Sequence, residues 1–333
     1  MELVLPERLR EGDNLLVVAP SSNIEGVPRE LFQIGLKNIE EMGFNVEIHP
    51  SCRGSYKGTS GPPKERAKVL HDAFSKDEVD GIMCFWGGWN SNDLLDHLDW
   101  GLIRANPKVF IGYSDITVLN TVLYEKAGMV NFQGPAFITF THEFLMPWEV
   151  EVFKDILMKP AESYQLKESP SYVDDPYYYN HPDKVVEESL NPGWRIINNG
   201  KSKGRIIGGH LGTLLALAGT GYWPDLEGKL LFIEEDEGGN PKNVRRLFRQ
   251  LEQMGVLDEI NGLLLGRIPE VTGITGDLSI ESLIGDILEE ADYPIVSEMD
   301  IGHTNPIATI PVGVLSEIST EEETLTFLEP CIK

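Results

Sequence analysis

A serine at the end of a short apolar run is the first residue of this sequence that suggests chemistry. The run Val109–Ile111 is followed by the turn Gly112-Tyr113-Ser114-Asp115, and residues 116–126 then carry apolar side chains at helical spacing. A strand, a tight turn with serine and a helix present a hydroxyl nucleophile, and the next amide points to where an oxyanion would form. The signature G-x-S-x-G is not met, because Ile116 replaces its second glycine. Ser114 also fits an N-cap, with Asp115 facing the helix dipole, so both interpretations stay open.

Two histidines and one glutamate lie in sequence contexts where they could act as the base and the carboxylate that a serine nucleophile needs. His303 lies in a turn rich in glycine and proline, and His210 directly follows a glycine pair. Glu234 ends the apolar run 229–233, where a carboxylate could orient an imidazole and stabilise its protonated form. The alternatives are a hydrogen-bonded structural histidine and a charged residue that only marks the end of a strand.

Metal and dinucleotide motifs are absent from the sequence. There is no His-x-x-x-His or Cys-x-x-Cys pair, and Cys52, Cys84 and Cys331 are far apart. The pair Gly87-Gly88 would let backbone amides approach a ligand, but neither G-x-G-x-x-G nor G-x-x-x-x-G-K-[ST] occurs. We therefore expect no cofactor and no metal ion.

The elements that must position these residues alternate between strand and helix in the first part of the chain. Strands are expected at 14–20, 45–49, 81–85 and 109–111, and helices at 27–42, 63–74, 93–98 and 116–126. This order predicts a doubly wound, Rossmann-like parallel sheet. Functional residues of such sheets collect at the carboxyl ends of strands, where Gly87-Gly88 and Ser114 both lie. Their shared position supports the nucleophile interpretation.

The later part of the chain predicts a second domain. Residues 160–203 are interrupted by prolines and are rich in aromatics, including Tyr177–Tyr179 and Trp194. They predict a linker that also forms a wall or lid, or a surface loop packed by its own aromatic residues. We expect an N-terminal nucleophile domain at 1–165, this linker and substrate loop at 166–203, and a β-rich, mixed α/β C-terminal domain at 204–333.

Composition excludes several classes of function. The net charge of −25 opposes binding to nucleic acid, which is itself a polyanion. No apolar run approaches the roughly 20 residues that span a bilayer, and the first residues lack the pattern of a secretory signal. The cysteines form no disulfide framework. We expect a cytoplasmic protein that binds neither nucleic acid nor membranes.

Taken together, the motifs resemble those of the LD-carboxypeptidase family of serine peptidases, and within it the microcin C immunity branch. The matching stretches are Val18-Ala-Pro-Ser21, Gly87-Gly88 with Asn90-Ser-Asn92, Asn106–Thr117, Gly134-Pro135, Asn191-Pro-Gly-Trp194, Ile207-Gly-Gly209, Leu231–Glu235, Gly302–Pro306 and Pro311-Val-Gly313. Each stretch is weakly specific alone, and their joint order and spacing carry the resemblance.

The resemblance implies a Ser-His-Glu triad in which Ser114 attacks a carbonyl, His303 transfers the proton and Glu234 holds the imidazole. The adjacent Glu235 leaves the carboxylate ambiguous by one residue. The resemblance also implies an oxyanion hole formed by the amides of Gly88 and Asp115. Substrate would contact Gly87, Asn90 and Trp194, and the tryptophan could stack a nucleobase. Family members are usually homodimers.

The branch determines the expected substrate. Immunity-type members cleave an amide between an aminoacyl or peptidyl group and a nucleotide-like moiety, and this is the function we expect. The alternative is a murein-tetrapeptide carboxypeptidase that releases terminal D-Ala, and a second alternative is a binding protein that sequesters such a ligand without cleaving it. His210 departs from many relatives, which carry Asn after the glycine pair, and this leaves the contacts of that turn open.

Overall fold

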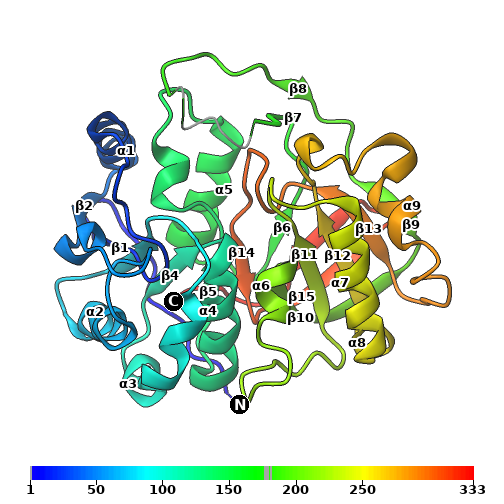
Figure 1. The fold of residues 1–333 in the computed structure, drawn as a ribbon, viewed down its shortest axis with the longest axis horizontal. Helices are drawn as coiled ribbons and strands as arrows, with labels where there is room; N and C mark the ends of the chain where they lie inside the picture. Colours follow the sequence, from blue (N-terminus) through cyan, green and yellow to red (C-terminus); the bar gives the residue numbers. More distant parts are fainter. Residues whose placement is uncertain (1, 176–179, 181) are drawn as a thin grey trace.

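The computed structural model describes residues 2–175, 180 and 182–333, which form two α/β lobes lying side by side (Figure 1). The N-terminal lobe contains a six-stranded sheet in the order β14-β5-β4-β3-β1-β2. Its five parallel strands are β1 (Asn14–Val18), β2 (Asn45–Ile48), β3 (Gly81–Cys84), β4 (Val109–Gly112) and β5 (Asn131–Gln133). The sixth strand, β14 (Ile310–Val312), is antiparallel to β5.

Alternate residues of the central strands pack on opposite faces of this sheet. Val17, Met83 and Ile111 belong to one apolar cluster, and the neighbouring positions in each strand belong to another. The helices follow the same division: α1 (Arg29–Glu41) and α5 (Pro147–Met158) cover the first face, whereas α2 (Pro63–Ser75), α3 (Trp100–Ala105) and α4 (Thr117–Val122) cover the second. The expected doubly wound sheet is confirmed.

The C-terminal lobe contains a mixed sheet of eight strands in the order β6-β16-β15-β10-β11-β12-β13-β9. Its parallel centre consists of β10 (Lys201–His210), β11 (Leu230–Glu234), β12 (Gly262–Gly266) and β13 (Ile295–Met299). Antiparallel strands flank it: β6 (Tyr164–Leu166), β9 (Arg195–Asn198), β15 (Leu315–Ser319) and β16 (Thr324–Phe327). The helices are α6 (Leu211–Leu215), α7 (Pro241–Gln253), α8 (Val256–Glu259) and α9 (Ile280–Ile284). This lobe matches the expected β-rich, mixed architecture.

Several local expectations differ from the structure. Residues 93–97 of the expected helix 93–98 lie within a 3₁₀ helix, Ser91–His97. The expected helix 116–126 begins as the 3₁₀ turn Ser114–Ile116 and ends as the π turn Leu123–Ala127. The expected loop 160–203 contains β6, β7 (Ser171–Tyr172), β8 (Ser189–Leu190) and β9. Tyr177–Tyr179, expected in a wall or lid, lie outside the described residues.

Two strands pair with the sheet of the other lobe, and the sequence pattern does not predict either exchange. β6 follows α5 of the N-terminal lobe but joins the C-terminal sheet, whereas β14 leaves the C-terminal lobe to join the N-terminal sheet (Figure 1). The domain boundaries at 165 and 204 stay a prediction, since the two lobes exchange strands around them. The loop 300–309, between β13 and β14, therefore passes from one lobe to the other. No helix in the described part of the chain is long and apolar enough to cross a membrane.

Candidate active site

Ser114 follows the carboxyl end of β4 in a backbone conformation that serine rarely adopts. Its φ angle is 64°, in the left-handed region, and such a conformation costs about 1–3 kcal/mol. Gly87, after β3, lies against it: a Cβ atom at Gly87 would come within 2.8 Å of the Ser114 hydroxyl. The neighbouring parallel strands thus bring the serine and the glycine pair together, as their shared sheet edge predicts.

The side chain of Asp115 connects the serine turn to the two neighbouring loops. Its buried carboxylate accepts hydrogen bonds from the Ser21 hydroxyl and from the Ser91 amide, the latter at 2.8 Å. In return, the Ser91 hydroxyl donates to the Asp115 carbonyl at 2.6 Å. These bonds hold the loop that carries Gly88 next to the first turn after Ser114. The first amides of a helix lack internal acceptors, which suits the N–H of Asp115, in the first turn after Ser114, to a ligand.

Glu234 and His303 meet directly. The Oε2 atom of Glu234, at the end of β11, lies 2.7 Å from Nδ1 of His303, and the carboxylate is almost fully buried. Because a carboxylate only accepts, Nδ1 donates and Nε2 keeps its lone pair. Gly302 permits this approach: a Cβ atom there would lie 2.7 Å from Cβ of Glu234.

The electrostatic surroundings favour the protonated form of His303. Burial opposes protonation, but the Glu234 carboxylate outweighs burial and raises the pKa of His303 above its ordinary value. The ring of Tyr113 packs edge-on against the imidazole, with 5.0 Å between centroids. This arrangement stabilises the imidazolium that a general base becomes when it takes a proton.

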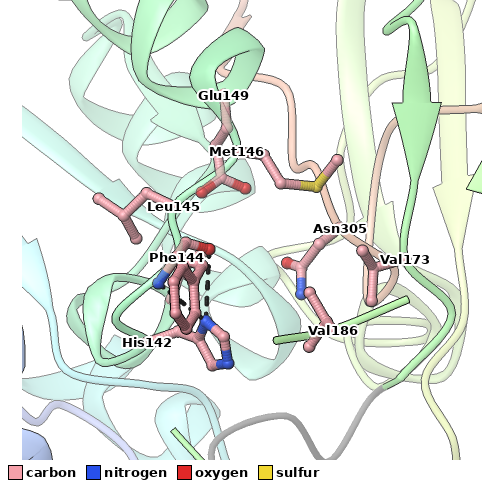
Figure 2. Close-up of a pocket in the computed structure, with 9 residues that line it drawn as sticks. His142, Phe144, Leu145, Met146, Glu149, Val173, Val186 and Asn305 are labelled. Carbon is pink, nitrogen blue, oxygen red and sulfur yellow. Dashed lines mark hydrogen bonds between the residues drawn. The ribbon is translucent and has the colours of Figure 1, made fainter. Parts of the chain in front are cut away.

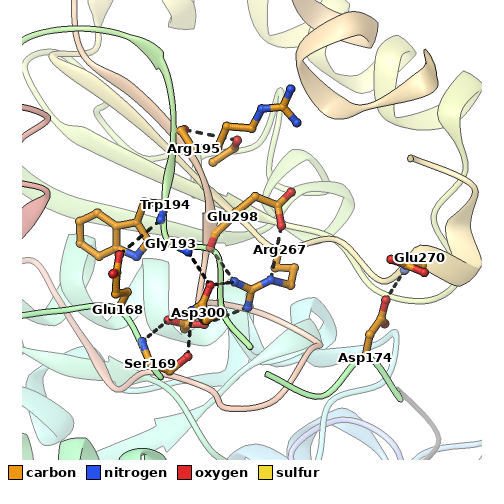
Figure 3. A network of polar contacts seen from close by, with 12 residues as sticks. Glu168, Ser169, Asp174, Gly193, Trp194, Arg195, Arg267, Glu270, Glu298 and Asp300 are labelled. Carbon is orange, nitrogen blue, oxygen red and sulfur yellow. Dashed lines mark hydrogen bonds and ion pairs between the residues drawn. The ribbon is translucent and has the colours of Figure 1, made fainter. Parts of the chain in front are cut away.

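A buried ion pair fixes the start of the loop that carries His303. Asp300 accepts a hydrogen bond of 2.9 Å from Arg267, after β12, and one of 2.8 Å from the Ser169 amide. Figure 3 shows Arg267 between Asp300 and Glu298, with Ser169 on the opposite side of Asp300. The Asp300 carbonyl also accepts from the Ala308 amide at 2.8 Å, which closes the loop on itself.

Residues of the N-terminal lobe and the linker hold the far side of the same loop. Glu149 of α5 accepts a 2.7 Å hydrogen bond from the Ile307 amide, and Val173 exchanges backbone hydrogen bonds with Asn305. Figure 2 shows the Glu149 carboxylate and the Asn305 amide reaching the same small pocket from different elements. Burial raises the pKa of Glu149 to about 8. His303 is thus positioned from both lobes.

Ser114 and His303 open into one cleft between the lobes, with a volume of about 490 Å³. The cleft is lined by Ser22, Trp86, Gly87, Gly88, Trp89, Tyr113, Ser114, Ile138, Asp236, Glu237, Gly238, His303, Asn305 and Ile307. In the described part of the chain, no hydrogen bond joins the Ser114 hydroxyl to His303. Such bonds are often formed only in the substrate complex.

The remaining residues expected at the site occupy different positions. The backbone of Asn90 accepts a hydrogen bond from Arg66, and its side chain does not line the cleft. Trp194 is buried in the C-terminal lobe, where its amide donates to Glu168, so the structure does not bring it to the cleft (Figure 3). Glu235 approaches His210 at 2.7 Å and therefore belongs to a different histidine.

Sequence reasoning missed the two tryptophans as parts of the cleft. Trp86 and Trp89 flank the glycine pair, and Trp89 is 81% exposed although it is a large apolar side chain. The sequence pattern that could have identified them is a pair of aromatic residues on both sides of a glycine turn at the end of a strand. Glu149 gave no signal, because a glutamate in the first turn of a helix is usual.

Family models cover both lobes. The model of the LD-carboxypeptidase N-terminal domain matches residues 15–134, and that of the C-terminal domain matches residues 203–318. The chain belongs to the LD-carboxypeptidase family. This is a family of serine hydrolases, so the chain is an enzyme of that class. The fold class and the family inferred from the motifs are confirmed.

Relatives at similar identity carry different names. A probable murein peptide carboxypeptidase of Bacillus subtilis is 30% identical over 96% of this chain and 92% of its own length. The microcin C7 self-immunity protein MccF of Escherichia coli is 30% identical over 98% of this chain and 96% of its own. The chain is thus similar to proteins of both branches.

Solved structures of relatives superimpose on nearly the whole chain. An MccF-like protein from Bacillus anthracis is 33% identical with a TM-score of 0.91, covering 98% of this chain and 99% of its own. MccF in complex with aspartyl sulfamoyl adenosine is 29% identical with a TM-score of 0.93, covering 99% and 100%.

Proposed function

We propose that this enzyme is a serine amidase that cleaves the amide between an aminoacyl or peptidyl group and a nucleotide-like moiety. The observation that carries the proposal is the shared cleft, which Ser114, His303 and two tryptophans all line. An indole exposed beside the nucleophile offers a stacking surface for a base, which contributes about 1–3 kcal/mol. The complexes of MccF with aminoacyl sulfamoyl nucleotides support the same substrate class.

The proposed mechanism assigns a role to each group. Ser114 Oγ attacks the carbonyl while Nε2 of His303 takes its proton, and Glu234 holds the imidazole through Nδ1. The amides of Gly88 and Asp115 bind the oxyanion, where one donor is worth about 3–4 kcal/mol. His303 then gives the proton to the leaving nitrogen, and a water molecule activated by the same imidazole hydrolyses the acyl-enzyme.

The charge of the cleft narrows the substrate class. Asp236 and Glu237 line one wall, and no lysine or arginine does so in the described part of the chain. A negative group would be repelled there and a free ammonium attracted. The substrate is therefore expected to place a neutral or cationic part, such as a free α-amino group, against this wall.

The second candidate is release of D-Ala from a murein tetrapeptide, which the similarity to the Bacillus subtilis carboxypeptidase favours. Both candidates use the same serine, so the substrates must be compared directly. The enzyme and Ser114→Ala are incubated with lysyl- and glutamyl-sulfamoyl adenosine and with a murein tetrapeptide, and products are identified by mass spectrometry.

We expect the wild type to cleave the lysyl compound fastest and Ser114→Ala to cleave nothing. Preferential cleavage of the tetrapeptide would replace the first candidate with the second. Retained turnover in Ser114→Ala would overturn the triad. Tight ligand binding without cleavage, together with no labelling of Ser114 by a fluorophosphonate probe, would indicate a sequestering protein.

A further inference from the structure

A second cluster of a histidine and carboxylates lies beside the proposed triad and has no role in it. His210 ends β10 and pairs in register with Glu234 at the end of the parallel strand β11. Glu235 and Asp236 continue from β11 alongside the His210 ring. We propose that His210, Glu235 and Asp236 form a binding site for one divalent transition-metal ion of the Zn²⁺ type.

The three side chains have the spacing of a metal site. One ligand atom from each lies within 4.8 Å of the others. Nε2 of His210 is 2.7 Å from a Glu235 oxygen and 3.6 Å from a Asp236 oxygen. Tetrahedral zinc with bonds near 2 Å sets its ligand atoms roughly 3.3 Å apart. Small side-chain rotations therefore suffice to enclose the ion.

One buried atom of this cluster, Oε2 of Glu235, lacks a hydrogen-bond partner among the described residues. Nε2 of His210 forms an ion pair with the other oxygen of Glu235 at 2.7 Å, and the two side chains are only 10% and 5% exposed. A buried polar atom without a partner costs about 1–3 kcal/mol. A metal ion would take the place of the proton between His210 and Glu235 and would bind the unpartnered oxygen.

The surroundings of the histidine support ligation through Nε2. Binding there requires the proton on Nδ1, where the Thr213 hydroxyl at 3.0 Å can accept it in place of the hydrogen bond that Nδ1 accepts from the Thr213 amide at 3.2 Å. Such an outer hydrogen bond fixes the tautomer and ring orientation of a metal ligand. The backbone of His210 is itself held, because its amide donates to Thr117 at 2.9 Å.

The cluster also has an open side. Asp236 lines the catalytic cleft and its side chain is 23% exposed, so an ion can enter from the cleft and complete its coordination with water. One imidazole with two carboxylates suits zinc or cobalt better than magnesium, which prefers oxygen ligands. The rings of His210 and His303 are 5.9 Å apart, so a cation held here is expected to inhibit hydrolysis.

The test measures metal binding to the full chain without an affinity tag or substrate. Zn²⁺ is titrated by calorimetry, and Co²⁺ binding is followed by its visible absorption. His210→Asn is the principal variant, because Asn is a strong N-cap and can replace the bond that His210 accepts from the Thr213 amide at 3.2 Å. Asp236→Asn removes a second ligand, and His97→Asn controls for histidines outside the cluster.

We expect one ion per chain, with affinity at least about tenfold weaker in His210→Asn and Asp236→Asn and unchanged in His97→Asn. Absence of saturable binding would overturn the site, as would equal affinity in a His210→Asn variant whose circular dichroism and Tm match the wild type. The outcome is independent of the proposed hydrolysis. Metal binding without amidase activity contradicts only the proposed function, and activity without metal binding contradicts only this inference.

Discussion

Glu234 and His303 form a hydrogen bond of 2.7 Å across the junction of two segments that are far apart in the chain, whereas the next residue, Glu235, faces His210. Adjacent glutamates thus point to different histidines. This arrangement favours Glu234 over Glu235 as the proposed triad carboxylate, since Glu234 is the one of the two that reaches Nδ1 of His303.

Glutamine substitutions at the two positions are expected to differ strongly in effect. Glu234→Gln keeps the shape but removes the charge that orients and stabilises the imidazolium, so kcat should fall by about 10²–10⁴-fold. Glu235→Gln is the matched control and should change kcat by less than about tenfold. Steady-state kinetics on the substrate identified for the enzyme decide the matter, and equal losses in both variants would contradict the assignment.

Gly302 is expected to be required for the approach of Glu234. Gly302→Ala would place a Cβ atom 2.8 Å from the Glu234 carboxylate, at a φ angle of 110° that disfavours alanine. We expect lower kcat together with a lower free energy of unfolding, the backbone alone contributing about 1–2 kcal/mol.

The control for this variant is Gly219→Ala, which shares a positive φ angle but has open space around the added atom. Its free energy of unfolding should fall to a similar degree, because alanine is disfavoured at a positive φ angle, but its kcat should equal that of the wild type. Denaturant unfolding and kinetics measure the two effects separately. If Gly302→Ala retains wild-type kcat, the contact with Glu234 does not matter for activity.

Ser114 and Glu234 could be predicted because each follows a continuous apolar run, and such runs form parallel strands whose carboxyl ends meet. The order of strands and helices likewise predicted both sheets. These features depend on local patterns that a single sequence displays. The family resemblance supplied the pairing of the residues, which no local pattern contains.

The position of His303 could not be predicted by the same reasoning. It depends on β14, a strand of three residues that crosses to the other lobe and pairs with β5. Trp194 is the opposite case, since its neighbouring motif suggested a ligand contact whereas the side chain is buried in the core. The positions of His303 and Trp194 both depend on contacts between segments far apart in the chain, and residue spacing does not predict such contacts.

Glu149 is expected to make stability depend on pH. Its pKa is raised from 4.5 to about 8 by burial, with partial relief from the Ile307 amide. Between these values the folded state binds more protons than the unfolded state, so stability falls as the pH rises, by up to about 1.4 kcal/mol per pH unit. Glu149→Gln accepts the same hydrogen bond but does not titrate.

Urea unfolding of wild type and Glu149→Gln across pH 5–9 measures this contribution, because groups common to both proteins cancel in the difference. The variant should gain stability relative to wild type as the pH rises and level off above about pH 8. A difference that stays constant over this range would show that Glu149 does not titrate as its burial indicates.

Trp89, which lines the cleft, and Trp194, which is buried in the core, are expected to give opposite phenotypes when they are replaced by alanine. Trp89 is 81% exposed in the cleft, so Trp89→Ala should weaken binding of an aminoacyl sulfamoyl nucleotide by about tenfold or more in KM with little change in kcat. Trp194 is buried, so Trp194→Ala should lower the free energy of unfolding by about 3–5 kcal/mol without a specific effect on KM.

Kinetics on substrates with and without the base separate the loss of stacking from a general loss of folded enzyme. An unchanged KM in Trp89→Ala, or a KM effect that persists when the base is removed, would exclude Trp89 as the stacking surface.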